Sequence, residues 1–112
     1  MEITYRNKKI KKIFDSEKNL QKTYGTLSKN IQVRMAQLKA ADCLDDIPRV
    51  PPPKCHELSE NRKGQLSVDL NHNMRLILKP DYDIPPRRDD GGLDWEQVTK
   101  IQIIEVVDTH TK

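Results

Sequence analysis

The fold is decided by residues 63–79, which read Lys63-Gly64-Gln65-Leu66-Ser67-Val68-Asp69-Leu70-Asn71-His72-Asn73-Met74-Arg75-Leu76-Ile77-Leu78-Lys79. Leucine, valine and methionine recur at every second position on both sides of the polar triplet 71–73. A period of two is typical of a strand with one buried face, and asparagine favours turns. This stretch therefore predicts a β-hairpin with strands at 66–70 and 74–79 and one face on the core.

A further strand pattern lies near the end of the chain, at residues 98–107. The period of two puts Ile101, Ile103 and Val107 on one face and Ile104 and Val106 on the other. A strand that is apolar on both faces is covered on both faces. We therefore expect this final strand to be central in the sheet.

The N-terminal residues have a helical period instead. After a short β-type run at 3–5, Asn7 can cap a helix whose apolar residues fall at i, i+3 and i+4. This pattern predicts a first helix that ends or kinks at residues 15–16, and a helical turn can continue toward Gly25. The apolar stripe consists of Ile10, Ile13 and Phe14, and the positions between them are Lys8, Lys9, Lys11 and Lys12.

A second helix is predicted from Leu27 to about Cys43, because apolar residues recur there at i, i+4, i+8 and i+11. Four prolines within 47–53 exclude helix and central strand from that segment, which we interpret as an extended connector. Residues 80–97 contain prolines, glycines and many acidic residues. We interpret them as a long loop, of the kind that is usually functional or mobile.

The order of the predicted elements is strand, helix, helix and three strands, which indicates an α+β fold. We expect one domain, residues 1–112, with two N-terminal helices packed on a small, mainly antiparallel sheet. The sequence has no run of ten apolar residues and no apolar signal segment at its start, so we expect a cytoplasmic protein that does not span a membrane. Cys43 and Cys55 are expected to be free thiols, with no metal and no cofactor.

The charge is unevenly distributed along the chain. Residues 1–40 contain ten Lys/Arg against three Asp/Glu, whereas residues 41–112 contain ten against fourteen. This asymmetry favours a polyanionic partner for the N-terminal part. The alternative is a solvated helix face without a partner.

Several cationic and imidazole side chains lie at the ends of predicted strands: His56, Arg62, Lys63, Arg75 and His110. RNA can be cleaved without a metal ion if the 2′-hydroxyl loses a proton, the phosphorane is stabilised and the 5′-oxygen gains a proton. Histidine suits the proton steps, and the planar fork of arginine suits the phosphate. Taken singly, the two histidines are also typical surface residues, Arg75 is a typical strand-surface ion pair, and His72 belongs to the turn.

The same residues resemble a known family. The run His56-Glu57-Leu58, the step Lys63-Gly64 into Ser67-Val68-Asp69-Leu70, the return Asn73-Met74-Arg75 and the ending Val106-Val107-Asp108-Thr109-His110 are similar to HigB-type plasmid-maintenance killer proteins. These belong to the RelE/ParE superfamily of toxins. The opening, Ile3 to Phe14, is also similar to the start of that family.

The resemblance implies a RelE-like fold and a ribosome-dependent endoribonuclease that cuts mRNA by attack of the 2′-hydroxyl, without a metal ion. By position, His56 and His110 would transfer protons, Arg75 would hold the scissile phosphate and Asp108 would orient its neighbours. A HigA-like helix-turn-helix antitoxin would be the partner protein, besides the ribosome and mRNA. The residues expected to meet RNA are Lys8, Lys9, Lys11, Lys12, Lys54, Arg62 and Lys63.

Two positions depart from the family pattern. Thr109 replaces a tyrosine, and Ser59 replaces a lysine. Loss of one oriented donor in such sites costs on the order of 10²–10³ in rate. Two alternatives to an RNA-cleaving toxin therefore stay open: a ParE-like inhibitor of DNA gyrase, and an inactive module that binds RNA or an antitoxin.

Overall fold

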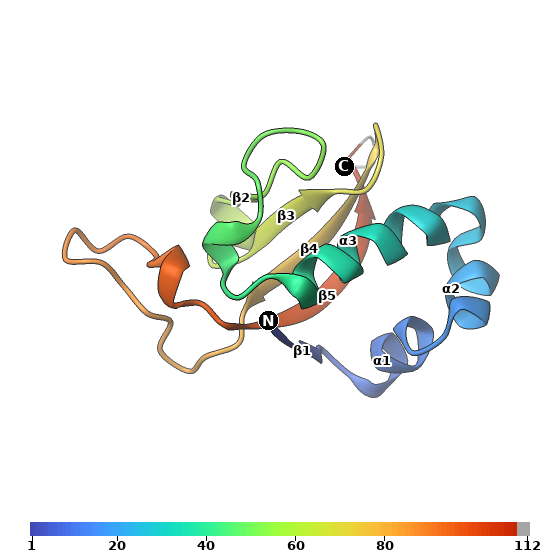
Figure 1. Ribbon diagram of the computed structural model, residues 1–112, viewed down its shortest axis with the longest axis horizontal. Coiled ribbons are helices and arrows are strands. Elements are labelled where there is room, and N and C mark those ends of the chain that lie inside the picture. Colours follow the sequence, from blue (N-terminus) through green and yellow to red (C-terminus); the bar gives the residue numbers. More distant parts are fainter. Residues whose placement is uncertain (110–112) are drawn as a thin grey trace.

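The computed structural model describes residues 1–109 and is drawn in Figure 1. One strand opens the chain, three α-helices follow it, and the other strands come after the helices. In chain order the elements are β1 (Glu2–Tyr5), α1 (Lys8–Phe14), α2 (Glu17–Tyr24), α3 (Ser28–Ala40), β2 (His56–Glu57), β3 (Leu66–Asp69), β4 (Met74–Pro80) and β5 (Lys100–Asp108).

The strands form one sheet in the order β1-β5-β4-β3-β2. β1 is parallel to β5, and the other neighbours are antiparallel. The expected α+β class and the mainly antiparallel sheet are confirmed. The hairpin is confirmed as well: β3 pairs with β4 from Leu66 opposite Leu78 to Asp69 opposite Arg75.

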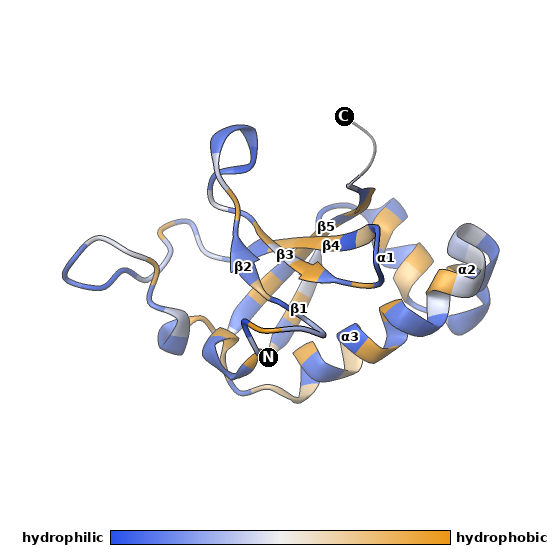
Figure 2. Cartoon of the chain, turned by 90° about the horizontal axis from the view of Figure 1, so that it is seen from above, coloured by the Kyte–Doolittle hydropathy of each residue, from blue (hydrophilic) through white to orange (hydrophobic). Residues whose placement is uncertain are grey.

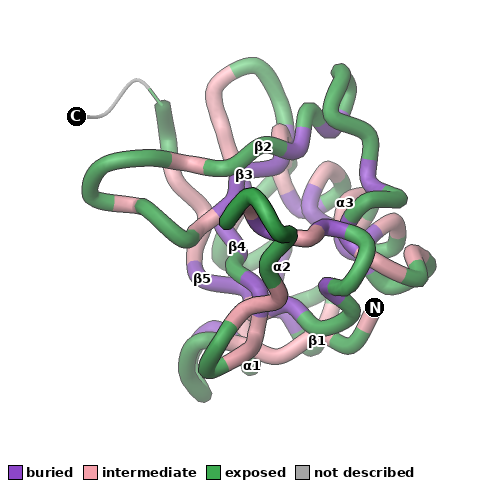
Figure 3. The backbone as a smooth tube through the Cα atoms, turned by 90° about the vertical axis from the view of Figure 1, so that its left-hand side faces the viewer, coloured by how far each residue is buried: buried purple, intermediate pink, exposed green. Residues whose placement is uncertain are grey.

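One face of the sheet rests on the core and the other does not. Leu66, Val68, Leu76 and Leu78 are at most 1% exposed, and they belong to the core cluster that also contains residues of all three helices. Figure 3 shows the buried segments in the strands and the exposed ones in the loops around them. Because side chains alternate along a strand, the opposite side carries a second set, and we call that side the outer face. It consists of His56, Ser67, Asp69, Arg75, Ile77, Glu105 and Val107.

Because β5 contains a β-bulge, some of its residues lie on a different face of the sheet than predicted. Leu78 pairs with Ile103 and Ile77 pairs with Glu105, so the register skips Ile104. The extra residue moves Val106 to the core face, opposite Leu76, where it packs against the core cluster. A simple period of two had assigned it to the other face, because a bulge reverses the alternation beyond it.

The helices also differ from the prediction, because there are three α-helices within residues 1–109 instead of two. The Oγ of Ser16 accepts a hydrogen bond from the backbone N–H of Asn19 (3.0 Å) and starts α2 as a separate helix. Gly25, with φ of 59°, ends α2 in a conformation that favours glycine. The predicted turn toward Gly25 is thus a full helix.

Helix α3 ends at Ala40, before the expected Cys43. Its buried stripe is Ile31, Met35 and Leu38, and Figure 2 shows the hydrophobic and hydrophilic bands along it. Two side chains tie α3 to the end of β3. Arg34 Nε donates to the carbonyl oxygen of Asp69 (2.6 Å), and Asn30 Nδ2 donates to that of Leu70 (2.7 Å).

The segment 80–97 lies at the end of the molecule opposite α2 and projects from the sheet (Figure 1). Its last part is anchored, which the sequence did not indicate. Leu93 and Trp95 are buried in the core cluster, and Arg49 lies over the Trp95 ring at 3.8 Å. Ile84, in contrast, is 86% exposed. Within residues 1–109, no helix is long and apolar enough to cross a membrane.

Candidate nucleic-acid interface and active site

His56 lies on β2, the outermost strand, with an exposed side chain. Its Nδ1 is 3.0 Å from the carbonyl oxygen of Lys54. A carbonyl only accepts hydrogen bonds, so in this contact Nδ1 carries the proton. In the neutral ring Nε2 is then the acceptor, which is the form that can take a proton from a hydroxyl group.

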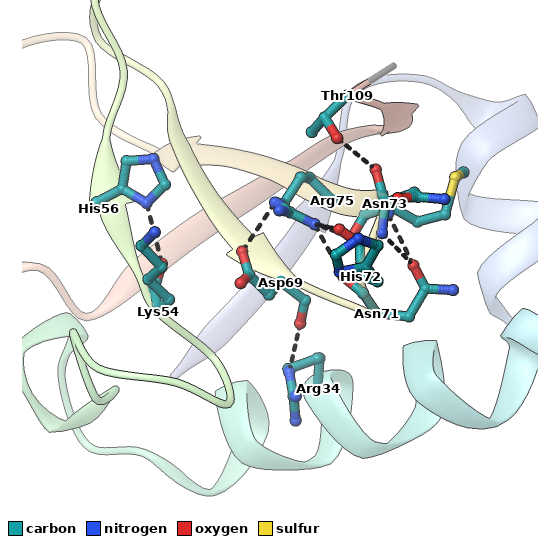
Figure 4. A network of polar contacts seen from close by, with 10 residues as sticks. Arg34, Lys54, His56, Asp69, Asn71, His72, Asn73, Arg75 and Thr109 are labelled. Atoms are coloured by element: carbon teal, nitrogen blue, oxygen red, sulfur yellow. Dashed lines mark hydrogen bonds and ion pairs between the residues drawn. The ribbon is translucent and has the colours of Figure 1, made fainter. Parts of the chain in front are cut away.

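The backbone that orients His56 is unusual. Lys54 has φ of 46°, in the left-handed region that residues with a side chain rarely adopt. Its N–H donates to the carbonyl oxygen of Val50 (3.0 Å), which closes a turn around the prolines 51–53 of the connector. Strained positions of this kind cluster at functional sites. The exposed Lys54 side chain stands beside the histidine, as Figure 4 shows.

Arg75 leaves β4 on the outer face, and its guanidinium is held by the hairpin itself (Figure 4). Nε is 2.9 Å from Oδ1 of Asp69, and both side chains are about one-fifth exposed (21% and 19%). Nη1 donates to the carbonyl oxygens of Asn71 (2.9 Å), Met74 (3.1 Å) and His72 (3.4 Å). Within residues 1–109, Nη2 makes no hydrogen bond.

The Asp69 carboxylate has an incomplete set of partners. Oδ1 is buried and receives no hydrogen bond of acceptable geometry from residues 1–109, although the Arg75 Nε is close enough for an ion pair. Charge, and not a directed N–H, therefore holds the two groups together.

His56 and Arg75 share the outer face but are not adjacent. His56 is opposite Ser67, and Arg75 is opposite Asp69, two residues further along β3. The usual strand spacing and rise then put their Cα atoms about 12 Å apart. Figure 4 shows Asp69 between them.

Asp108 does not join them. The register puts it opposite Met74, whose side chain packs against the core, so its side chain leaves β5 on the side away from Arg75. Thr109 is tied to the hairpin turn, with its N–H and its Oγ1 each donating to the carbonyl oxygen of Asn73 (both 2.9 Å). The expectation for His110 falls outside the described residues.

Arg62 reaches across the outer face from the short 3-10 helix Glu60–Arg62. Nη2 donates to Oε2 of Glu105 on β5 (2.8 Å), and Nη1 donates to Oε1 of Gln65 (2.9 Å). Burial and the Glu105 charge together raise the pKa of Tyr24 on α2. The Glu105 carboxylate therefore interacts electrostatically with two groups, the Arg62 guanidinium and the Tyr24 phenol.

The remaining predicted RNA-binding residues flank the sheet. Lys54 and Lys63 are exposed beside β2 and β3, whereas the α1 lysines are exposed near β1 and β5. Lys9 and Lys12 line a hollow of about 440 Å³ whose floor includes Ile13. Lys8 and Lys11 line a second hollow, of about 420 Å³, together with residues of β1. The spacing of the lysines thus divides them between two surfaces.

Three charged residues near the site were missed: Arg34, Asp69 and Glu105. Asp69 could have been found, because residues 69 and 75 are equally distant from the turn centre at His72. Glu105 and Arg34 meet their partners only through the tertiary fold. Among residues 1–109, no group of three or more His, Cys, Asp or Glu side chains is arranged to hold a metal ion.

A comparison with solved structures finds the same fold in a protein described as a YoeB/ParE toxin from Agrobacterium tumefaciens. The superposition covers 96% of this chain and 98% of that chain, with a TM-score of 0.55 and 12% sequence identity. At this identity the likeness shows the fold alone. No protein-family model matches the chain. No curated protein matches it either.

Proposed function

We propose that this chain is the toxin of a type II toxin–antitoxin system and a ribosome-dependent mRNA endoribonuclease. The observation that carries the proposal is the fold shared with a toxin over 96% of the chain. An outer face with an oriented histidine and an arginine adds chemical support. The HigB-type sequence pattern supports the ribosome-dependent form of the activity.

In the proposed reaction, His56 Nε2 takes the proton of the 2′-hydroxyl group. The oxygen then attacks the adjacent phosphorus, and the guanidinium of Arg75 neutralises the charge of the phosphorane. The bond to the 5′-oxygen breaks, and that oxygen takes a proton from a second acid. By the family pattern this acid is His110. The products are a 2′,3′-cyclic phosphate and a 5′-hydroxyl end.

The proposed partners follow from the same reading. The ribosome and mRNA would bind the basic residues that flank the sheet, and a HigA-like helix-turn-helix protein would neutralise the toxin. The protein would act in the cytoplasm. The basic residues proposed to contact RNA are Lys8, Lys9, Lys11, Lys12, Lys54, Arg62 and Lys63.

Induction in growing bacteria tests the proposal. We expect growth arrest together with shortened translated mRNAs, and we expect His56→Ala to remove both effects. His72→Ala is the matched control, because His72 is an exposed histidine of the hairpin turn outside the proposed site. Growth arrest with intact mRNA would contradict the proposal.

A second candidate is a toxin of the same fold that binds its target and cuts nothing, such as a gyrase inhibitor. The observation that favours it is the engagement of Arg75 by Asp69 and by three carbonyl oxygens of the hairpin. The same induction experiment separates the two, because a gyrase inhibitor would give double-strand DNA breaks while mRNA stays intact. An inactive RNA- or antitoxin-binding module would leave growth unchanged.

A further inference from the structure

The outer face presents its arginines already bound to carboxylates of the same chain. Arg75 is held by Asp69 at 2.9 Å, and Arg62 is held by Glu105 at 2.8 Å. The second pair is the more accessible one, because each of its side chains is 35% exposed. It also joins parts of the chain that are 43 residues apart.

The Arg62–Glu105 pair lies across the middle of the outer face. Ser67, Ile77 and Glu105 are neighbours on β3, β4 and β5. Arg62 comes from the β2 side and bonds Glu105, so its side chain passes over the other two. Both are 2% exposed although they face away from the core cluster, as expected beneath such a bridge.

A phosphodiester group competes for the same guanidinium. Carboxylate and phosphate both carry oxygens that accept two parallel N–H bonds from arginine. An ion pair at this exposure contributes little, because water screens it, so a phosphate can displace the carboxylate. The displaced Glu105 then stays next to the bound phosphate and repels it.

From this arrangement we propose that Glu105 is an internal competitor of RNA, which occupies Arg62 in the free chain and limits the affinity of the outer face for phosphates. The inference rests on the proposed function only in naming RNA as the ligand. In this role the Glu105 carboxylate weakens RNA binding. Removing its charge is therefore predicted to tighten binding.

The test is RNA affinity measured by fluorescence anisotropy with the purified full chain at low salt. The probe is a short single-stranded RNA with 2′-O-methyl groups, which cannot be cut by 2′-hydroxyl attack. We expect Glu105→Gln to bind roughly three- to tenfold more tightly than the wild type. Glu96→Gln is the matched control, because it removes the same charge from an exposed residue of the 3-10 helix Trp95–Gln97.

A double variant that combines Glu105→Gln with Arg62→Gln tests whether the gain in RNA affinity depends on Arg62. In that background Glu105→Gln should gain clearly less affinity, because the guanidinium it would release is absent. Circular dichroism of each variant verifies that the fold is kept. If Glu105→Gln binds no better than Glu96→Gln, or gains equally without Arg62, the inference is overturned while the proposed function stands. If neither the wild type nor any variant binds the RNA, the inference is overturned, whereas the proposed function, which requires the ribosome, is not.

Discussion

Asp69 and Arg75 face each other across the β3–β4 hairpin, and their side chains form the ion pair that fixes the guanidinium on the outer face. The same guanidinium closes the hairpin by donating to two carbonyl oxygens of the turn, those of Asn71 and His72, and to that of Met74 at the start of β4. Arg75 thus has a structural role in the free chain, whatever it binds in a complex. This double use has consequences for stability and for the design of variants.

Asp69→Ala should destabilise the protein by about 1–3 kcal/mol, because it leaves a mostly buried guanidinium without its counter-ion. The measurement is urea unfolding followed by circular dichroism. A double-mutant cycle with Arg75→Ala isolates the coupling between the two side chains. Equal stability of Asp69→Ala and the wild type would show that the ion pair does not hold the hairpin.

Replacing the four α1 lysines by glutamine should weaken association with ribosomes. Each lysine that contacts a phosphate adds roughly 0.7–0.9 to the slope of log affinity against log salt. The quadruple variant should therefore bind less tightly and with a shallower slope in sedimentation assays over a salt series. The residues are Lys8, Lys9, Lys11 and Lys12.

A charge-matched control uses four other exposed lysines. If this control weakens ribosome association as much as the α1 variant, net charge and not the position of α1 explains the binding. Unchanged association of the α1 variant would remove that helix from the interface. The control residues are Lys18, Lys29, Lys39 and Lys100.

The buried thiol of Cys55 should make stability fall in alkaline solution. Burial raises its pKa from 9.0 to about 12. Below pH 9 the Cys55 thiol keeps its proton in both the folded and the unfolded chain. Above pH 9 the thiol of the unfolded chain loses its proton, whereas that of the folded chain still keeps it. The free energy of unfolding should therefore fall between about pH 9 and pH 12, by at most about 1.4 kcal/mol per pH unit. Urea unfolding of Cys55→Ala should show a shallower decline, and an identical decline would contradict the assignment.

Trp95 is the single tryptophan of the chain and reports on the segment 80–97. Its side chain is 7% exposed, is covered by Arg49, and its Nε1 donates to Oε2 of Glu57 (3.3 Å). We expect blue-shifted fluorescence and weak quenching by acrylamide in the native state, and a red shift on unfolding. Emission typical of a solvated indole in the native state would mean that this segment is not anchored.

The elements that follow from local pattern were predicted well. The β3–β4 hairpin, the first helix and the α+β class depend on periodicity and turn residues, which act over a few positions. The Asp69–Arg75 pair belongs to the same class, because a turn centred on His72 fixes which residues of the hairpin are opposite. An ion pair on the strand surface was expected for Arg75 besides a phosphate contact, and the structure identifies Asp69 as its partner.

The elements that depend on distant contacts were not predicted. The two residues of β2 become a strand only by pairing with β3, and the contacts that anchor Trp95 include Glu57 and Arg49, which are far away in the sequence. The bulge at Ile104 depends on the register with β4 and moves Val106 to the core face. The Arg62–Glu105 pair depends on the strand order. No local pattern encodes these relationships.

The most direct test of the central claim is mRNA cleavage in a purified translation system. Programmed ribosomes are mixed with the wild type, His56→Ala or His72→Ala, and the RNA ends are mapped over time. We predict cuts by the wild type and by His72→Ala that leave 2′,3′-cyclic phosphate ends, and a rate about 10²–10⁴ lower for His56→Ala. Intact mRNA with the wild type, or equal rates for the two histidine variants, would contradict the account.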